Sequence, residues 1–111
     1  MLDRPHQEKN KQQAMEASLQ TYEAIFNHSR VGLAISAANT ETLDLVNPYF
    51  AWMHGYTVED LTGRPFAEIL APEERPQLAR LSALLHETGN HSYEAKHLKK
   101  DGTVFPVLVN A

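Results

Sequence analysis

Apolar side chains near the start of the chain are spaced as they are in a helix. Between residues 14 and 28 they stand four, three and four apart, which is the spacing of a short coiled-coil seam. Residues 1–13 are polar and rich in Gln, Lys and Glu, so we expect a disordered or frayed helical end there. The seam residues are Met15, Leu19, Tyr22 and Phe26. They either lie on the domain's own sheet or pair with a second copy of the chain.

The next apolar segments are short and predict β-strands. Residues 31–36 form a brief apolar run, and residues 43–45 alternate between apolar and polar positions. Two strands are therefore expected here, with a polar turn at residues 39–41 between them.

A second pair of strands, residues 93–98 and 104–109, flanks Asp101-Gly102. This dipeptide is a strong hairpin signal because Gly accepts positive φ. Pro106 has no N–H to donate, so the last strand is expected to be irregular or unpaired there.

Helix start and stop signals are concentrated between the two strand pairs. Asn47 can cap a helix that begins at Pro48, and Gly55 can end it. Thr57 can cap a second short helix that stops at Gly63. The sequence therefore predicts a strand end followed by two very short helices.

Two further helices are expected before the hairpin. Pro65 opens a one-turn helix that ends near Leu70. A proline at the fifth helical position would remove a needed hydrogen bond, so the longer helix is expected to start at Pro76 rather than Pro72 and to run to Glu87.

The stretch from residue 46 to 63 resembles the N-P-x-F-x-x-L-x-G-Y-x-x-x-(E/D)-L-x-G signature of PAS domains. The matching positions are Asn47-Pro48, Phe50, Met53, Gly55-Tyr56, Asp60-Leu61 and Gly63. Residues 70–75 are similar to the I-H-P-E-D-R segment of the family, and residues 100–107 to its K-D-G-(S/T) hairpin and following strand. The resemblance covers about residues 22–111.

This resemblance implies an α+β fold. An antiparallel sheet would carry short helices and one longer helix on one face, with the N-terminal helix outside. Residues 1–28 would form the polar segment and amphipathic helix, and residues 29–111 the PAS core. The final strand of the family pattern, which lies beside the first strand, is absent from residues 1–111, so an open sheet edge is expected.

The resemblance also implies a function. It indicates a non-catalytic regulatory module of a bacterial signal-transduction protein, a sensor and dimerisation domain that passes a ligand or redox signal to an attached output domain of the histidine kinase or diguanylate cyclase type. A ligand-free protein–protein interaction module and a haem-binding gas or redox sensor are the alternatives. The ligand pocket would be apolar and could equally be filled by side chains. Its expected lining is Phe50, Met53, Ile69, Leu81, Leu85, His97 and Phe105.

Histidines are the main candidates for site chemistry. His86 and His91 are five residues apart with Gly89 between them, which does not fit the helical zinc-hydrolase motif. They lie in the region where haem-binding PAS domains hold iron, so the resemblance makes them the candidate haem ligands. His97 shares a strand face with Tyr93, and it lies either in the family's pocket or on the solvent face of the hairpin.

Composition narrows the remaining classes. The 111 residues, 42% of them hydrophobic, suffice for one domain. The absence of cysteine excludes the cysteinyl-flavin adduct of related photosensors and is compatible with a reducing compartment. A net charge of −4 argues against nucleic acid as a partner, and no apolar run is long enough for membrane insertion. We expect a cytoplasmic homodimer, covalently attached to an output domain, with a small-molecule ligand or none.

Overall fold

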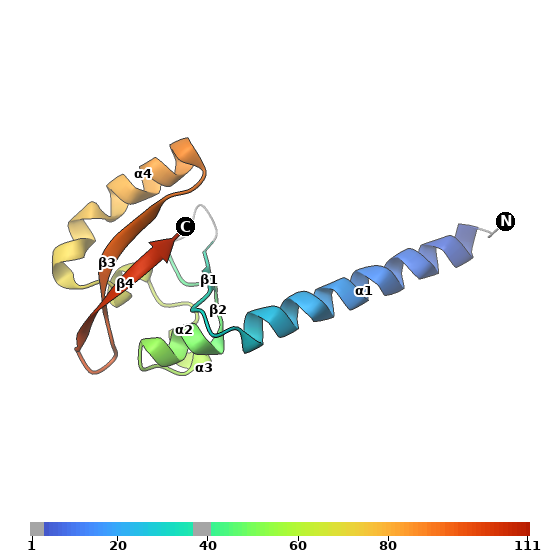
Figure 1. Ribbon diagram of the computed structural model, residues 1–111, viewed down its shortest axis with the longest axis horizontal. Coiled ribbons are helices and arrows are strands. Elements are labelled where there is room, and N and C mark those ends of the chain that lie inside the picture. The colour runs from blue at the N-terminus through green and yellow to red at the C-terminus, as the bar shows by residue number, and fades with distance from the viewer. Residues whose placement is uncertain (1–3, 37–40) are drawn as a thin grey trace.

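The computed structural model describes residues 4–36 and 41–111, with side chains for all of these except residues 4–7 and 86. A long N-terminal helix projects from a core of short helices and antiparallel strands, giving overall extents of 63 × 32 × 20 Å (Figure 1). Most of the turn expected at residues 39–41 lies outside the described residues. The α+β class expected from the sequence is confirmed.

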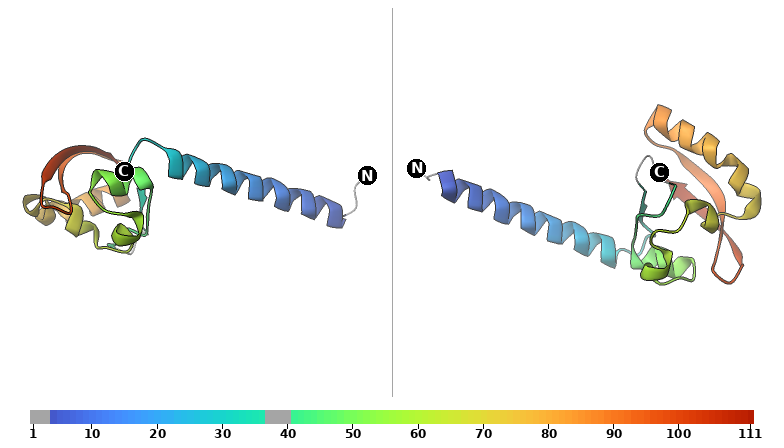
Figure 2. Two further views of the ribbon diagram at one scale, coloured as in Figure 1. Left: turned by 90° about the horizontal axis from the view of Figure 1, so that it is seen from below. Right: turned by 180° about the vertical axis from the view of Figure 1, so that it is seen from behind.

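Helix α1 spans Arg4–His28 and is longer than expected. It begins ten residues before Ala14 because the polar residues that precede Ala14 are mostly Gln, Lys and Glu, which are good helix formers, and include no glycine. All three views show α1 pointing away from the strands (Figure 2). Its apolar seam therefore does not lie on the domain's own sheet.

The first strand pair is shorter than the sequence predicted. Strands β1 (Ala34–Ile35) and β2 (Leu45–Val46) pair antiparallel through two residues each. Leu43 leaves this ladder because its backbone bonds the later loop instead. Its N–H donates to the carbonyl of Arg64 at 2.8 Å, and its own carbonyl accepts from the N–H of Gly63 at 2.7 Å.

Each strand of the second pair is one residue longer than expected. Strands β3 (Ser92–Leu98) and β4 (Val104–Asn110) form an antiparallel hairpin in which Pro106 lies opposite Lys96. The carbonyl of Lys96 accepts a hydrogen bond from the N–H of Ala71 at 2.9 Å, which joins β3 to the segment between η1 and η2. The sequence predicted one sheet, but the described residues form two separate two-stranded sheets, because no described segment pairs with both β1 and β4.

The short helices follow their capping signals. Helix α2 spans Pro48–Met53 and helix α3 spans Val58–Leu61. The Asn47 side chain accepts from the N–H of Phe50, and the Thr57 side chain accepts from the N–H of Asp60. Chain reversal after α2 uses Gly55, whose φ of 78° is costly for any residue with a Cβ.

The segment between α3 and β3 contains two 3₁₀ helices and one α-helix. They are η1 (Phe66–Ile69), η2 (Pro72–Gln77) and α4 (Leu78–Thr88). The prediction that the long helix starts at Pro76 is wrong by two residues, because Pro76 is taken up by the preceding 3₁₀ helix. Helix α4 lies beside the β3–β4 hairpin (Figure 1).

A small core joins these elements. Its fully enclosed side chains come from β2, the two short α-helices, η1 and the loop before β2. They are Leu43, Val46, Ala51, Leu61 and Ile69, with Phe50, Tyr56, Val58 and Phe66 packed around them. None of the helices in the described ranges is both long and apolar enough to cross a membrane.

Candidate functional site

A buried asparagine connects α1 to the core. The side chain of Asn47 is fully enclosed and makes four hydrogen bonds. Its Oδ1 accepts from the N–H of Leu33 at 2.9 Å and of Phe50 at 2.8 Å, and its Nδ2 donates to the carbonyls of Phe26 at 3.0 Å and Val31 at 2.9 Å. One side chain therefore holds together the end of α1, the segment leading to β1 and the start of α2.

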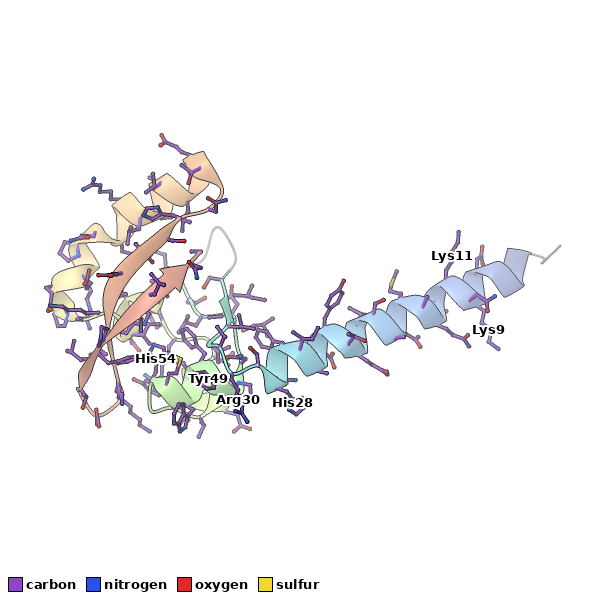
Figure 3. All side chains as sticks on the ribbon, in the orientation of Figure 1. Lys9, Lys11, His28, Arg30, Tyr49 and His54 are labelled. Atoms are coloured by element: carbon purple, nitrogen blue, oxygen red, sulfur yellow. The ribbon has the colours of Figure 1, made fainter. Side chains whose placement is uncertain are left out.

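A buried histidine pair lies at the other end of α2. His54 caps the helix and is 1% exposed, and His97 on β3 is 4% exposed. His54 Nε2 lies 2.9 Å from His97 Nδ1, and His54 Nδ1 lies 2.7 Å from the carbonyl oxygen of Phe50. Figure 3 labels His54 where α2 meets the hairpin. The solvent-face interpretation of His97 is wrong, because the hairpin turns this residue toward α2.

The partners of the pair assign its protons. A carbonyl oxygen only accepts, so His54 carries its proton on Nδ1 and donates to Phe50. The Nε2 of a neutral His54 is then an acceptor, so His97 must donate from Nδ1. This leaves His97 Nε2 as a lone pair, and no group in the described part of the chain bonds it.

Burial keeps both rings neutral. Desolvation lowers the pKa of His54, against a smaller opposing effect of its hydrogen bond to Phe50. Desolvation and the neighbouring His54 together lower the pKa of His97 to about 4. At neutral pH the pair is therefore uncharged, which is the state that the proton assignment requires.

Aromatic rings surround the histidines. Phe50 stacks on His54 with centroids 4.3 Å apart, and Phe105 meets the edges of His54 at 5.1 Å and His97 at 6.1 Å. Phe66 approaches His97 edge-on at 6.3 Å. We call His54, His97, Phe50, Phe66 and Phe105 the histidine cluster. It combines an apolar wall with one unused hydrogen-bond acceptor.

The structure brings together three of the seven residues expected to line a pocket, namely Phe50, His97 and Phe105. Ile69 is fully enclosed in the core, and Leu81 and Leu85 are half-buried on α4. Met53 packs under Gly32, where an added Cβ would come within 2.9 Å of its sulfur.

A separate shallow hollow of about 500 Å³ lies on the hairpin and η2, and none of the expected pocket residues lines it. It is lined by Glu74, Glu94, Ala95, Lys96, Pro106, Val107 and Leu108.

The haem candidates lie apart from the histidine cluster. His91 is half-buried next to the start of β3, and its ring stacks on Tyr93 with centroids 5.4 Å apart. The side chain of His86 is outside the described part of the structure. Within the described ranges no three His, Asp or Glu side chains are grouped so that they could hold a metal ion.

The seam of α1 is open to solvent. Met15 is 65% exposed, Leu19 55% and Tyr22 68%, while Phe26 is half-buried next to the core. Ile25 flanks the seam and is 60% exposed. Trp52 on α2 is 71% exposed, and its ring lies 5.4 Å from that of Tyr49, which Figure 3 labels near the base of α1.

Comparisons with known proteins agree with this architecture. The family model described as PAS domain matches residues 30–111. A sensor histidine kinase, TmoS of Ectopseudomonas mendocina, is 32% identical over 92 residues, which are 81% of this chain but 9% of the kinase. The chain thus spans less than a tenth of the length of this relative.

Solved structures with the same fold include two that cover most of this chain. The PAS domain of an HTR-like protein from Haloarcula marismortui is 20% identical with a TM-score of 0.76, over 92% of this chain and 84% of that one. The PAS domain of a LuxR-family transcriptional regulator from Burkholderia thailandensis, in complex with ethanol, is 24% identical with a TM-score of 0.70, over 80% of this chain and 79% of that one.

The chain belongs to the PAS domain family. Domains of this family are generally sensory rather than catalytic. The family signature led directly to Asn47, Phe50 and Gly55. It did not lead to His54, because that position is unspecified in the signature and its partner His97 is 43 residues away.

Proposed function

We propose that this chain is a regulatory PAS domain that senses a small molecule in its core and passes the signal through a homodimer formed by α1. The attached output domain is of the histidine kinase type, as in the related sensor kinase. We also propose that the domain lies in the cytoplasm, as expected from the sequence. The LuxR-family relative that holds ethanol supports a small-molecule ligand.

One observation carries the proposal, which is that both ends of the six-residue helix α2 are fixed by buried polar side chains. Asn47 at its start holds the carbonyl of Phe26 in α1, and His54 at its end holds His97 in β3. The carbonyl of His54 also accepts from the N–H of Lys100 at 2.8 Å, which ties it to the hairpin turn. A shift of the hairpin can therefore reach α1 through one short rigid helix.

The exposed seam supports the dimer. An isolated row of large apolar side chains on a solvent-exposed helix gains stability when it is buried against a second apolar surface. The seam has the spacing of a coiled coil, so a second copy of α1 is the partner that fits it. Figure 1 shows that α1 projects away from the core over most of its length.

Sedimentation of the chain at micromolar concentration tests the dimer. The double variant Leu19→Asp/Tyr22→Asp places charges in the seam and should give a monomer. Ala17→Asp/Ala24→Asp adds the same charges at exposed positions on the opposite side of α1 and is the matched control. A monomeric wild-type chain, or a seam variant that stays dimeric, would contradict this part of the proposal.

A chimera tests the regulatory role. In it, this chain replaces the matched segment of the related sensor kinase. Asn47→Ser keeps a helix-capping hydroxyl but loses the donor to Phe26, so kinase activity should change. Thr57→Ala removes a cap that does not touch α1 and serves as control. If activity is the same in all three chimeras, the domain passes no signal through Asn47, which contradicts the proposed regulatory role.

A further inference from the structure

The Nε2 of His97, unpaired among the described residues, can accept a hydrogen bond but cannot donate one, and this restricts the class of ligand that it can bind. Starting at the carbonyl of Phe50, every proton in the chain of hydrogen bonds is assigned by its neighbour, through His54 to His97. The series ends on an imidazole nitrogen that can only accept. A buried acceptor without a partner is costly, so a donor that reaches it gains stability on binding.

We propose that His97 Nε2 anchors a small neutral molecule that has an apolar body and one O–H or N–H donor. This inference rests on the proposed function, because it names the ligand class of the same sensor core. Phe66 and Phe105 stand edge-on to the His97 ring and would contact the apolar body. Ionised carboxylates are rejected, since an acceptor-only anion facing this lone pair has no proton to share.

His54 is a positioning residue in this site. Its Nε2 holds the proton of His97 on Nδ1, and its own Nδ1–H is held by the carbonyl of Phe50. Removal of His54 frees the His97 proton to move to Nε2, which would turn the acceptor into a donor. The selectivity of His97 for a donor ligand therefore depends on a ring that does not touch the ligand.

The first test is a long-range ¹⁵N–¹H spectrum of the full chain at neutral pH. The proposal expects both His54 and His97 as Nδ1–H tautomers, with His97 Nε2 unprotonated. Phenol should then move the Nε2 resonance of His97, whereas fluorobenzene, which has a similar size and no donor, should not. A proton on His97 Nε2 in the free protein, or equal responses to the two probes, would overturn the inference.

The second test is affinity. Removing one neutral hydrogen bond of about 1 kcal/mol corresponds to a loss of about fivefold. His97→Phe keeps an aromatic ring and should bind phenol about fivefold more weakly while binding fluorobenzene as the wild type does. His54→Phe should weaken the preference for phenol and leave fluorobenzene binding in place. If His97→Phe does not fold, the affinities of His97→Gln for phenol and fluorobenzene, together with the wild-type spectra, test the inference in its place.

Binding of a metal at His97 Nε2 in place of a neutral donor is the alternative outcome. If Co²⁺ or haemin shifts His97 Nε2 and phenol does not, the site is a metal site and the inference is overturned. Failure of the proposed function looks different from failure of this inference. A chimera that is regulated through Asn47 but lacks donor-selective binding contradicts only the proposed ligand class. Donor-selective binding without any effect on the kinase contradicts only the proposed signalling role.

Discussion

Acidification should unfold this domain through its buried histidine pair. In the unfolded chain a histidine has a pKa near 6.5, whereas in the folded domain burial and His54 lower the pKa of His97 to about 4. The folded state thus binds fewer protons than the unfolded state between these two pKa values. Stability is fully present above pH 6.5 and is lost as the pH falls toward 4.

The magnitude follows from the same two pKa values. At pH 5 the unfolded His97 is almost fully protonated and the folded one almost fully neutral, so the free energy of unfolding should fall by about 2 kcal/mol between pH 7 and pH 5. His54, whose pKa is also lowered, adds to the loss in the same direction. A second proton on His54 would also set two N–H groups against each other at the 2.9 Å contact.

Urea unfolding at pH 7, 6 and 5, followed by far-ultraviolet circular dichroism at one protein concentration, measures this effect. Fluorescence of Trp52 is a poor reporter because the side chain is 71% exposed. His97→Gln should be less stable at pH 7 and show a flatter dependence on pH, with His28→Gln, at an exposed position on α1, as the control for losing a histidine. A wild-type free energy of unfolding that is the same at pH 7 and 5 would refute the assignment of a buried neutral pair.

Three substitutions test the fold around the site, each by the free energy of unfolding at pH 7. Asn47→Ala should cost about 1 kcal/mol more than Asn47→Ser, because serine still caps α2; equal losses would show that the cap is unimportant. Gly55→Ala should cost about 1–2 kcal/mol because of the positive φ, and a neutral result would mean that the turn relaxes. Leu43→Ala, in the fully enclosed core, should cost about 3 kcal/mol, and a loss below 1 kcal/mol would indicate that the core collapses around it.

Local capping chemistry explains why so much of the helical layer could be predicted. Asn47-Pro48, Gly55 and Thr57 act on their immediate neighbours, and α2 and α3 begin and end where these residues direct. The hairpin likewise follows from Asp101-Gly102, whose turn is closed by the N–H of Gly102 donating to the carbonyl of Lys99.

The sequence-based predictions fail where segments that are far apart in the sequence bond or pack against one another. The backbone of Leu43 bonds residues 63 and 64 rather than extending β2, and no local pattern indicates this. Two members of the histidine cluster, His54 and Phe66, are missed for the same reason, since the cluster draws its residues from α2, η1, β3 and β4. Whether the seam of α1 faced its own sheet also depended on the direction in which α1 leaves the core, which is set by the hydrogen bonds of Asn47 to Phe26 and Val31.

Sensing and dimerisation should affect each other equally if α2 couples them. By linkage, a ligand that changes the dimerisation constant by some factor must have its own affinity changed by the same factor when the dimer forms. Phenol affinity measured on the monomeric Leu19→Asp/Tyr22→Asp variant, compared with the wild-type dimer, gives one side of this equality. The wild-type dimerisation constant with and without phenol gives the other. In Asn47→Ser, which lacks the bond from α2 to the carbonyl of Phe26, both factors should approach one together. If ligand affinity still depends on the dimer in that variant, the signal reaches α1 by a route that does not pass through Asn47.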